Sequence, residues 1–176
     1  MKLMRILILA GSMAATTLAA AAAPAPVAAP AATPGAAQVK AVQDLLASMQ
    51  AEKMMRTTAG TSRYSSEQQK QAVFDKLAQV PPAEIHRRLA VPVARFVSTE
   101  TAIEMTRFYG SSYGKRVLYQ TYNSKPTFQA QEVTPTKAEQ ADLKRPAYLK
   151  AAKALKAAEP AIQHESFVLL TQIMRK

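Results

Sequence analysis

The stretch of sequence that decides the fold is residues 97–122, which read VSTETAIEMTRFYGSSYGKRVLYQTY. A start signal around Ser98 precedes apolar residues at helical spacing, and Gly110 is a natural stop because glycine readily takes the left-handed conformation. Ser111 and Ser112 can then cap a second helix. The pattern predicts two successive helices with a tight turn between them. Their apolar positions are Ala102, Met105 and Tyr109 in the first and Val117, Leu118 and Tyr122 in the second.

Helical spacing continues on the N-terminal side of this stretch. Apolar residues at every third or fourth position predict one helix over residues 38–56. A capping signature at residues 65–69 opens a second helix, which ends at Pro81 and Pro82, and these prolines can open a third. Within that third helix, Pro92 marks a kink or a boundary.

The C-terminal side of the stretch is also helical in pattern. Thr136 and Glu139 have the spacing of a capping box, and residues 127–133 are the one stretch that could be extended. Pro146 and Pro160 divide the C-terminal half into about three pieces. No segment combines sustained apolar alternation with hairpin turn residues. We therefore predict an all-α fold, a small helical bundle of about six to seven helices.

Residues 1–23 have the pattern of a secretory signal peptide. Lys2 and Arg5 form a basic start, and an uncharged run then ends in alanines that suit signal peptidase. Glycine, serine and threonine interrupt the run, which favours cleavage over retention as a membrane anchor. Residues 24–37 form a Pro/Ala-rich linker, and we expect residues 38–176 to form a single helical domain. The expected location is the periplasm, with full secretion or anchoring by an uncleaved signal as alternatives.

The composition narrows the classes of function. Without cysteine, the chain has no lipoprotein anchor, disulfide or thiolate metal site. Its formal net charge is +11, and loss of a signal peptide that carries two basic residues and no acid would leave +9. This charge favours anionic neighbours, such as an envelope surface or an acidic periplasmic protein, whereas nucleic acid is not expected outside the cytoplasm. We expect no cofactor and no metal.

Residues 97–122 also match most of a longer pattern, which runs from a hydrophobic residue and a Thr-x-x-Glu element to Phe-Tyr, a serine and Gly-Lys or Gly-Gln. The residues that fit it are Phe108, Tyr109, Ser111, Gly114 and Lys115. This pattern resembles the exported bacterial family known as domain of unknown function 2059. Ser98 stands where threonine is usual in that family, and Thr101 where an acid is expected. The resemblance implies an all-helical periplasmic domain and implies no activity. In the chain itself, we expect Gly114 to permit a close approach of backbone or aromatic rings.

Two segments, residues 97–122 and 133–158, follow the same order of cap, helix, break and basic helix. Corresponding residues, such as Ala102 and Ala138, are 36 positions apart. The order suggests a degenerate repeat of one helical hairpin, although similar capping chemistry also arises by chance in helical proteins.

The chain also contains the residue types of a catalytic motif, without the predicted structural context that the motif requires. Residues 110–114 match the Gly-x-Ser-x-Gly nucleophile elbow around Ser112, and Asp142 and His164 follow in hydrolase order. The elbow requires a strand before the serine, whereas the preceding segment here is helical, so a helix–helix turn is favoured and a serine hydrolase is kept as an alternative. His86 and His164 lack the spacing of metal ligands, and both are expected on solvated helix faces.

Basic side chains are the main candidates for a functional surface. Residues 105–131 and 144–156 contain basic residues and no acid. We expect a non-enzymatic envelope binding or interaction module with a basic surface, whose partner is unknown. A small-ligand carrier that uses the tyrosine-rich region at residues 108–122 is a further alternative. The candidate contacts with an anionic surface are Lys115, Arg116, Lys144, Arg145, Lys150, Lys153 and Lys156.

Overall fold

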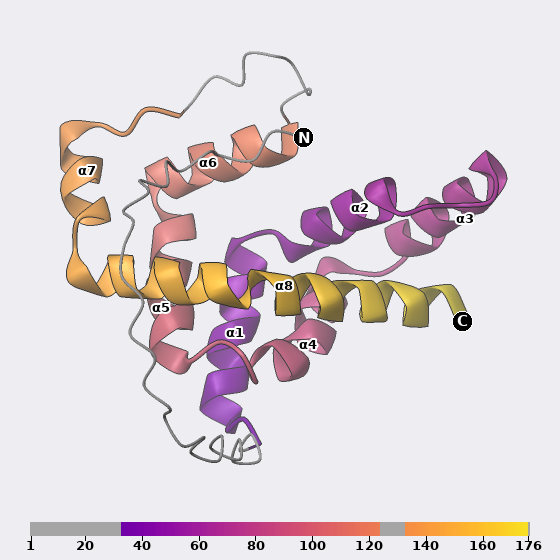
Figure 1. Ribbon diagram of the computed structural model, residues 1–176, viewed down its shortest axis with the longest axis horizontal. Coiled ribbons are helices and arrows are strands. Elements are labelled where there is room, and N and C mark those ends of the chain that lie inside the picture. Colours follow the sequence, from indigo (N-terminus) through magenta and orange to yellow (C-terminus); the bar gives the residue numbers. More distant parts are fainter. Residues whose placement is uncertain (1–32, 124–132, 176) are drawn as a thin grey trace, which may run out of the picture. The chain divides into compact units, whose positions relative to one another are not determined.

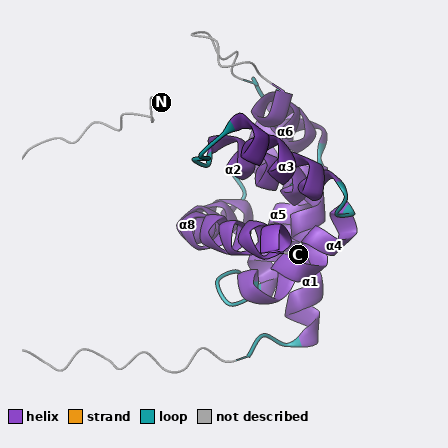
Figure 2. Ribbon diagram, turned by 90° about the vertical axis from the view of Figure 1, so that its right-hand side faces the viewer, coloured by secondary structure: helices purple, strands orange, loops and turns teal. Residues whose placement is uncertain are grey.

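The computed structural model describes residues 33–123 and 133–175, and every regular element within these ranges is an α-helix (Figure 1, Figure 2). The described helices are α1 (Ala36–Ser48), α2 (Ala51–Thr61), α3 (Glu67–Ala78), α4 (Pro82–Val93), α5 (Thr99–Gly110), α6 (Ser112–Asn123), α7 (Lys137–Leu143) and α8 (Pro146–Arg175). The predicted all-α fold is confirmed, although these ranges hold eight helices rather than six or seven. The expected signal peptide, most of the linker and nearly all of residues 127–133 lie outside the described residues.

The helix predicted over residues 38–56 is divided in two, which corrects that prediction. Gln50 has a φ of 58° and a ψ of 55°, so it lies in the left-handed region and separates α1 from α2. Leu46 before the break and Ala51 after it are both fully buried. The apolar spacing therefore continues through the turn, and periodicity along the sequence does not reveal the break.

Three local start signals are confirmed by side-chain caps. Ser66 and Ser98 each accept the backbone N–H three residues further on, at the starts of α3 and α5. Thr136 and Glu139 form a complete capping box at the start of α7. Pro82 is the first residue of α4, as the double proline predicted. These signals act within one helical turn, so the sequence alone is enough to locate them.

Helix α8 is continuous over 30 residues, so the predicted division at Pro160 is wrong. A proline in a helix interior has no N–H to donate and costs about 3 kcal/mol. Buried residues on both sides of the proline, among them Leu155, Ala158 and Ile162, hold the two halves against the same core. Tertiary packing therefore outweighs the local helix breaker, whereas Pro146 does mark a boundary because it opens α8.

The core is built mainly from α1, α4, α5 and α8. Helix α1 packs against α4 and α5, and α8 lies across α5, α4, α2 and α3 (Figure 1). Helix α6 packs chiefly on α5 and α7 chiefly on α8, so both are peripheral to this core. Across the described ranges, we find no helix with the length and apolar character needed to cross a membrane. The largest fully buried side chains include Leu45, Leu46, Met55, Leu89 and Val93.

The two histidines lie in different environments. His86 is buried, and its Nε2 lies 2.9 Å from Glu52 Oε2, so the pair links α4 to α2. The expectation of a solvated His86 is therefore wrong. His164 is exposed on α8, as expected.

The two segments of the suggested repeat share an order of elements but differ in length. Helices α5 and α6 have 12 residues each, whereas α7 has 7 and α8 has 30. The likeness is limited to a capped helix followed by a second helix, and the repeat stays a prediction.

Candidate functional site

The residues that fit the longer pattern of residues 97–122 build the turn between α5 and α6. Ser111 Oγ accepts the backbone N–H of Gly114 at 3.0 Å and donates to the carbonyl oxygen of Phe108 at 2.6 Å. One hydroxyl thus satisfies end groups of both helices. Gly110 ends α5 as predicted, but no glycine in the described ranges has a positive φ. The left-handed stop expected at Gly110 is therefore wrong, and Ser111, with φ −70° and ψ 163°, makes the turn.

Gly114 is buried at the closest approach of the two helices. A Cβ on this residue would lie 2.8 Å from Phe108 C and from Tyr109 Cα, and closer still to the carbonyl oxygen of Phe108. Real Cβ atoms do not approach backbone atoms so closely, so only glycine fits this turn. The expected close approach at Gly114 is confirmed.

The aromatic residues of the motif join the α5–α6 hairpin to α8. The ring centroid of Phe108 lies 5.0 Å from that of Tyr109, 6.1 Å from that of Tyr113 and 5.1 Å from that of Tyr148. These separations are those of attractive edge-to-face and tilted ring pairs. Because Tyr148 belongs to α8, the cluster fixes the hairpin against the long helix.

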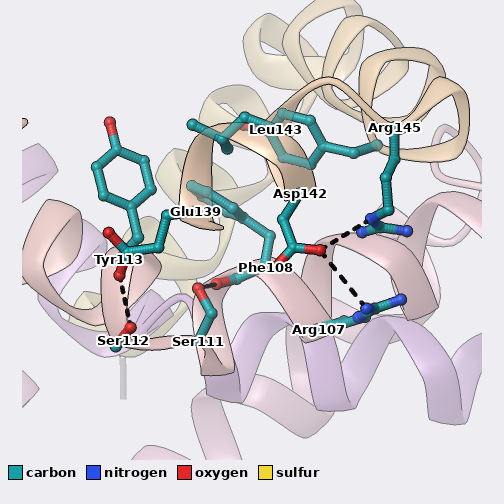
Figure 3. Close-up of a pocket in the computed structure, with 10 residues that line it drawn as sticks. Arg107, Phe108, Ser111, Ser112, Tyr113, Glu139, Asp142, Leu143 and Arg145 are labelled. Carbon is teal, nitrogen blue, oxygen red and sulfur yellow. Dashed lines mark hydrogen bonds and ion pairs between the residues drawn. The ribbon is translucent and has the colours of Figure 1, made fainter. Parts of the chain in front are cut away.

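Glu139 ties the start of α6 to the start of α7 (Figure 3). Ser112 Oγ donates to Glu139 Oε1 at 2.6 Å, and the Arg116 guanidinium donates to both carboxylate oxygens, at 3.1 and 2.7 Å. The backbone N–H of Thr136 donates to Oε2 at 2.9 Å as part of the capping box. The Arg116 hydrogen bonds, followed by those from Ser112 and Thr136, lower the pKa of Glu139 to about 2.

The geometry does not assemble the hydrolase triad that the sequence order suggested. Ser112 donates to Glu139, and Asp142 faces Arg145 and Arg107 (Figure 3). His164 lies about 27 Å along α8 from the residue that opens the helix, at 1.5 Å per residue. Ser112 lines a cavity with Tyr148, near the start of α8, so His164 is far from it. Among the described residues, no hydrogen bond joins Ser112, Asp142 and His164.

The two candidate arginines are engaged in ion pairs. Arg116 pairs with Glu139, and Arg145 pairs with Glu104 through Nη2 and lies 3.4 Å through Nε from Asp142 Oδ1. Arg107 Nη2 also lies 3.9 Å from Asp142 Oδ1. We refer to these residues together as the arginine cluster. Its members are Arg107, Arg116, Arg145, Glu104, Glu139 and Asp142.

A small cavity of about 90 Å³ lies within the arginine cluster (Figure 3). All of its charged lining side chains are engaged in the ion pairs described above, either with Asp142 or with Arg116 and Glu104 outside the lining, and its volume is well below that of a typical small-molecule site. The cavity therefore offers no separate binding group.

The candidate lysines differ from the arginines. Lys115, Lys144, Lys150, Lys153 and Lys156 are all exposed, and none forms an ion pair with another residue of the described ranges. Three of them, Lys150, Lys153 and Lys156, recur at intervals of three on α8, on the side away from buried Ala151 and Leu155. We call these three residues the lysine face.

Apolar and acidic residues also lie near the lysine face. Leu149 is 55 % exposed directly before Lys150. Glu100 of α5 is close enough for Lys150 to contribute to lowering its pKa, although the main causes are backbone and Ser98 hydrogen bonds. The lysine face spans about 9 Å along α8 at 1.5 Å per residue, which is close to the screening length in physiological salt.

Comparisons with known proteins return no relative. No protein-family model matches the chain, and no curated protein or solved structure matches it either. The resemblance to the family of domain of unknown function 2059 therefore stays a prediction. What the structure adds is a physical role for the residues that carry the resemblance, since most of them form the α5–α6 turn.

Sequence reasoning missed the acidic partners of the arginines. Glu139 was identified only as a capping residue, and Glu104 and Asp142 were given no pairing role. The Arg116–Glu139 and Arg145–Glu104 pairs span 23 and 41 residues. No spacing rule links residues so far apart, so only the packing of α5, α6 and α7 could reveal them.

Proposed function

We propose that this protein is a non-enzymatic binding module of the cell envelope, which attaches to an anionic lipid surface through the lysine face. The observation that carries the proposal is the row of three exposed lysines on α8 that have no ion-pair partner in the described ranges. Lys144, just before α8, adds a fourth exposed positive charge beside the row. The formal net charge, which is +11 for the full sequence and would be +9 without residues 1–23, also favours attraction to anionic surfaces.

The expected binding free energy is that of a reversible attachment. A lysine near an anionic membrane surface contributes ~1 kcal/mol, so a row of three or four gives weak to moderate binding that salt screens. Exposed Leu149 lies next to Lys150, at the N-terminal end of the lysine face, and can enter the headgroup region without unfolding the helix. Such a surface binds by charge density and does not need a fixed pocket.

The proposal includes export, which rests on residues 1–23 of the sequence. N-terminal sequencing of the protein recovered from the periplasm should begin within or just after the alanine run that precedes Pro24. Recovery of the chain only from the cytoplasm would contradict this part of the proposal.

Vesicle co-sedimentation tests the lipid attachment. The purified chain is mixed with vesicles of phosphatidylethanolamine and phosphatidylglycerol, and in parallel with neutral phosphatidylcholine vesicles. We expect binding to the anionic vesicles at low salt, little binding to the neutral ones, and release as salt rises to a few hundred millimolar. Combined Lys150→Glu, Lys153→Glu and Lys156→Glu substitutions should abolish sedimentation with the anionic vesicles.

A matched control separates the lysine face from net charge. The combined substitutions Arg56→Glu, Arg63→Glu and Arg95→Glu change the net charge by the same amount at exposed positions outside α8. This control should lose less binding than the lysine variant. Equal loss in both variants would contradict a defined face, and absence of binding to anionic vesicles would favour an acidic protein partner instead.

The non-enzymatic part of the proposal has its own test. A fluorophosphonate probe reacts with activated serine nucleophiles. Because Ser112 donates its proton to a carboxylate that Arg116 also holds, we expect the probe to leave the chain unlabelled. Labelling that disappears in Ser112→Ala would restore the hydrolase alternative.

A further inference from the structure

We infer that a groove between α2, α6 and α8 binds a small organic ammonium ion with an apolar body. The groove has a volume of about 450 Å³. It adjoins the lysine face near Lys156 but contains none of the three lysines, and the inference does not depend on the proposed attachment to lipid. The lining residues that carry the inference include Met54, Tyr109, Val117, Thr121, Tyr122 and Glu159.

The groove exists because α6 packs chiefly on α5 and stands away from α2 and α8. Its far end is tied down where Tyr122 Oη donates to the carbonyl oxygen of Met49 at 3.0 Å. Met49 lies at the junction of α1 and α2, next to left-handed Gln50. The hollow is thus framed by a hydrogen bond at one end and by the α5–α6 turn at the other, and its volume lies within the usual range for small-molecule sites.

The threonines that line the groove already donate their hydroxyl protons in hydrogen bonds within their own helices. Thr57, Thr58 and Thr121 donate to the backbone carbonyls four residues before them, at 3.1, 3.1 and 2.8 Å. What these side chains can still offer a ligand is methyl surface and oxygen lone pairs. Together with Met49 and Met54 they favour a ligand with an apolar body that brings its own hydrogen-bond donors.

The charge of the lining also favours a cation. Glu159 is the one ionisable acid or base among the lining residues apart from the tyrosines. Burial raises the pKa of Tyr122 to about 12 and raises that of Tyr109 as well, so both phenols are neutral at physiological pH. An ammonium group placed beside the Glu159 carboxylate would also lie near the neutral ring of Tyr109, on whose phenol the charge of Glu159 already acts, and such rings attract cations.

Two basic residues close to the groove restrict where the ammonium group of a ligand can lie. Lys53 Nζ lies 6.0 Å from the ring centroid of Tyr122, which shows that this ring already accepts a cation on one face. Lys156 lines a neighbouring hollow of about 260 Å³, which shares Met49, Tyr109 and Glu159 with the groove. The ammonium position is therefore at Glu159, and the apolar body extends away from Lys156, towards Met54 and Val117.

The test uses three probes of similar size and different charge: 2-phenylethylammonium, 2-phenylethanol and phenylacetate. Each is titrated into the purified chain at constant ionic strength, and binding is followed by the amide NMR shifts of α2 and α6. We expect the ammonium ion to bind roughly tenfold more tightly than the alcohol, and phenylacetate to bind most weakly. Glu159→Gln should bring the ammonium and alcohol affinities together, whereas Glu165→Gln, on α8 outside the groove, should preserve the difference.

A second readout locates the ligand. The chain has no tryptophan, so Thr121→Trp on α6 places a single fluorophore at the groove, and Thr171→Trp is a matched control on α8, outside the groove. The ammonium ion should change the emission of the first variant only. Equal affinities for the ammonium ion and the alcohol, tighter binding of phenylacetate, no binding of any probe, or an effect at Thr171→Trp alone would each overturn the inference.

Discussion

The arginine cluster and the lysine face have members that are little more than one helical turn apart along the chain. Their positive charges nevertheless have opposite roles. Arg145, directly before α8, pairs with Glu104 and Asp142. Lys150, one turn into α8, is exposed and has no ion pair within the described ranges. The arginines hold peripheral helices in place, whereas the lysines leave their charge in solvent, where a partner can reach it.

The difference follows from the chemistry of the two side chains. A guanidinium presents several donors in one plane, so Arg116 can hold both oxygens of Glu139, and this geometry requires a fixed partner. A lysine ammonium is compact and strongly hydrated, which suits an exposed helix side. Counting positive charges along the sequence therefore overestimates the charge that is available for binding, because acids from other helices already neutralise the arginines of the arginine cluster.

The largest expected effect breaks the hairpin that carries the arginine cluster. Gly114→Val adds side-chain atoms where even a Cβ would meet the backbone of Phe108 and Tyr109. We expect the free energy of unfolding to fall by about 1–3 kcal/mol or more, measured by urea denaturation. Gly110→Ala is the control, because a Cβ there meets nothing within 4 Å, and its stability should change by less than about 1 kcal/mol. Similar values for the two variants would mean that the turn is looser than described.

A second prediction concerns the pH dependence of the tie between α6 and α7. The pKa of Glu139 is about 2 in the folded chain and lies near 4.5 in the unfolded chain, so the folded state favours the ionised carboxylate. The stability that this group supplies is fully present above about pH 4.5 and is lost as the pH falls through about 2. The wild-type chain should therefore be more stable than Glu139→Gln at pH 6, and the two should converge near pH 2.

Melting curves of both chains across this pH range measure the difference. A constant gap between them at all pH values would contradict the lowered pKa. Asp142→Asn provides a comparison within the same cluster, because Asp142 is more exposed than Glu139 and should give a smaller difference at pH 6.

How far the sequence predicts this fold depends on the range of each interaction. The caps at Ser66, Ser98 and Thr136 were predictable because serine or threonine acts on an amide three residues away. The break at Gln50 and the continuous helix through Pro160 were not, because buried residues on both sides decide the backbone there. Local rules give the wrong answer at these two positions because the core outweighs them.

The same distinction between short-range and long-range interactions applies to the candidate site. The lysines of α8 were predictable as exposed, since three of them share a helix side opposite the buried residues. The roles of Arg116 and Ser112 were not, because both depend on Glu139, which packing brings from more than twenty residues away. The groove and Glu159 were also missed, because they depend on how far α6 stands from α2 and α8.

A third prediction sharpens the contrast between the two kinds of cation. Arg116→Lys keeps the positive charge but loses the two-point contact with Glu139. We expect this variant to melt at a lower temperature than the wild-type chain, with unchanged binding to anionic vesicles. Its control is Arg56→Lys, at an exposed position without an ion pair in the described ranges, which should leave the melting temperature unchanged. A wild-type melting temperature in Arg116→Lys would show that charge alone holds α7.

The smallest effect is expected when the lysine face itself is changed without changing its charge. The combined substitutions Lys150→Arg, Lys153→Arg and Lys156→Arg keep three positive charges on the exposed side of α8. Because the proposed attachment depends on charge density and not on the shape of the ammonium group, vesicle binding and its salt dependence should stay close to those of the wild-type chain. The melting temperature should also stay the same, since these side chains hold no partner in the described ranges. A clear loss of vesicle binding in this variant would mean that the lysines recognise a specific group through their hydrogen-bond geometry. The lysine face and the arginine cluster would then both act through specific hydrogen bonds and would differ only in the partner that they bind.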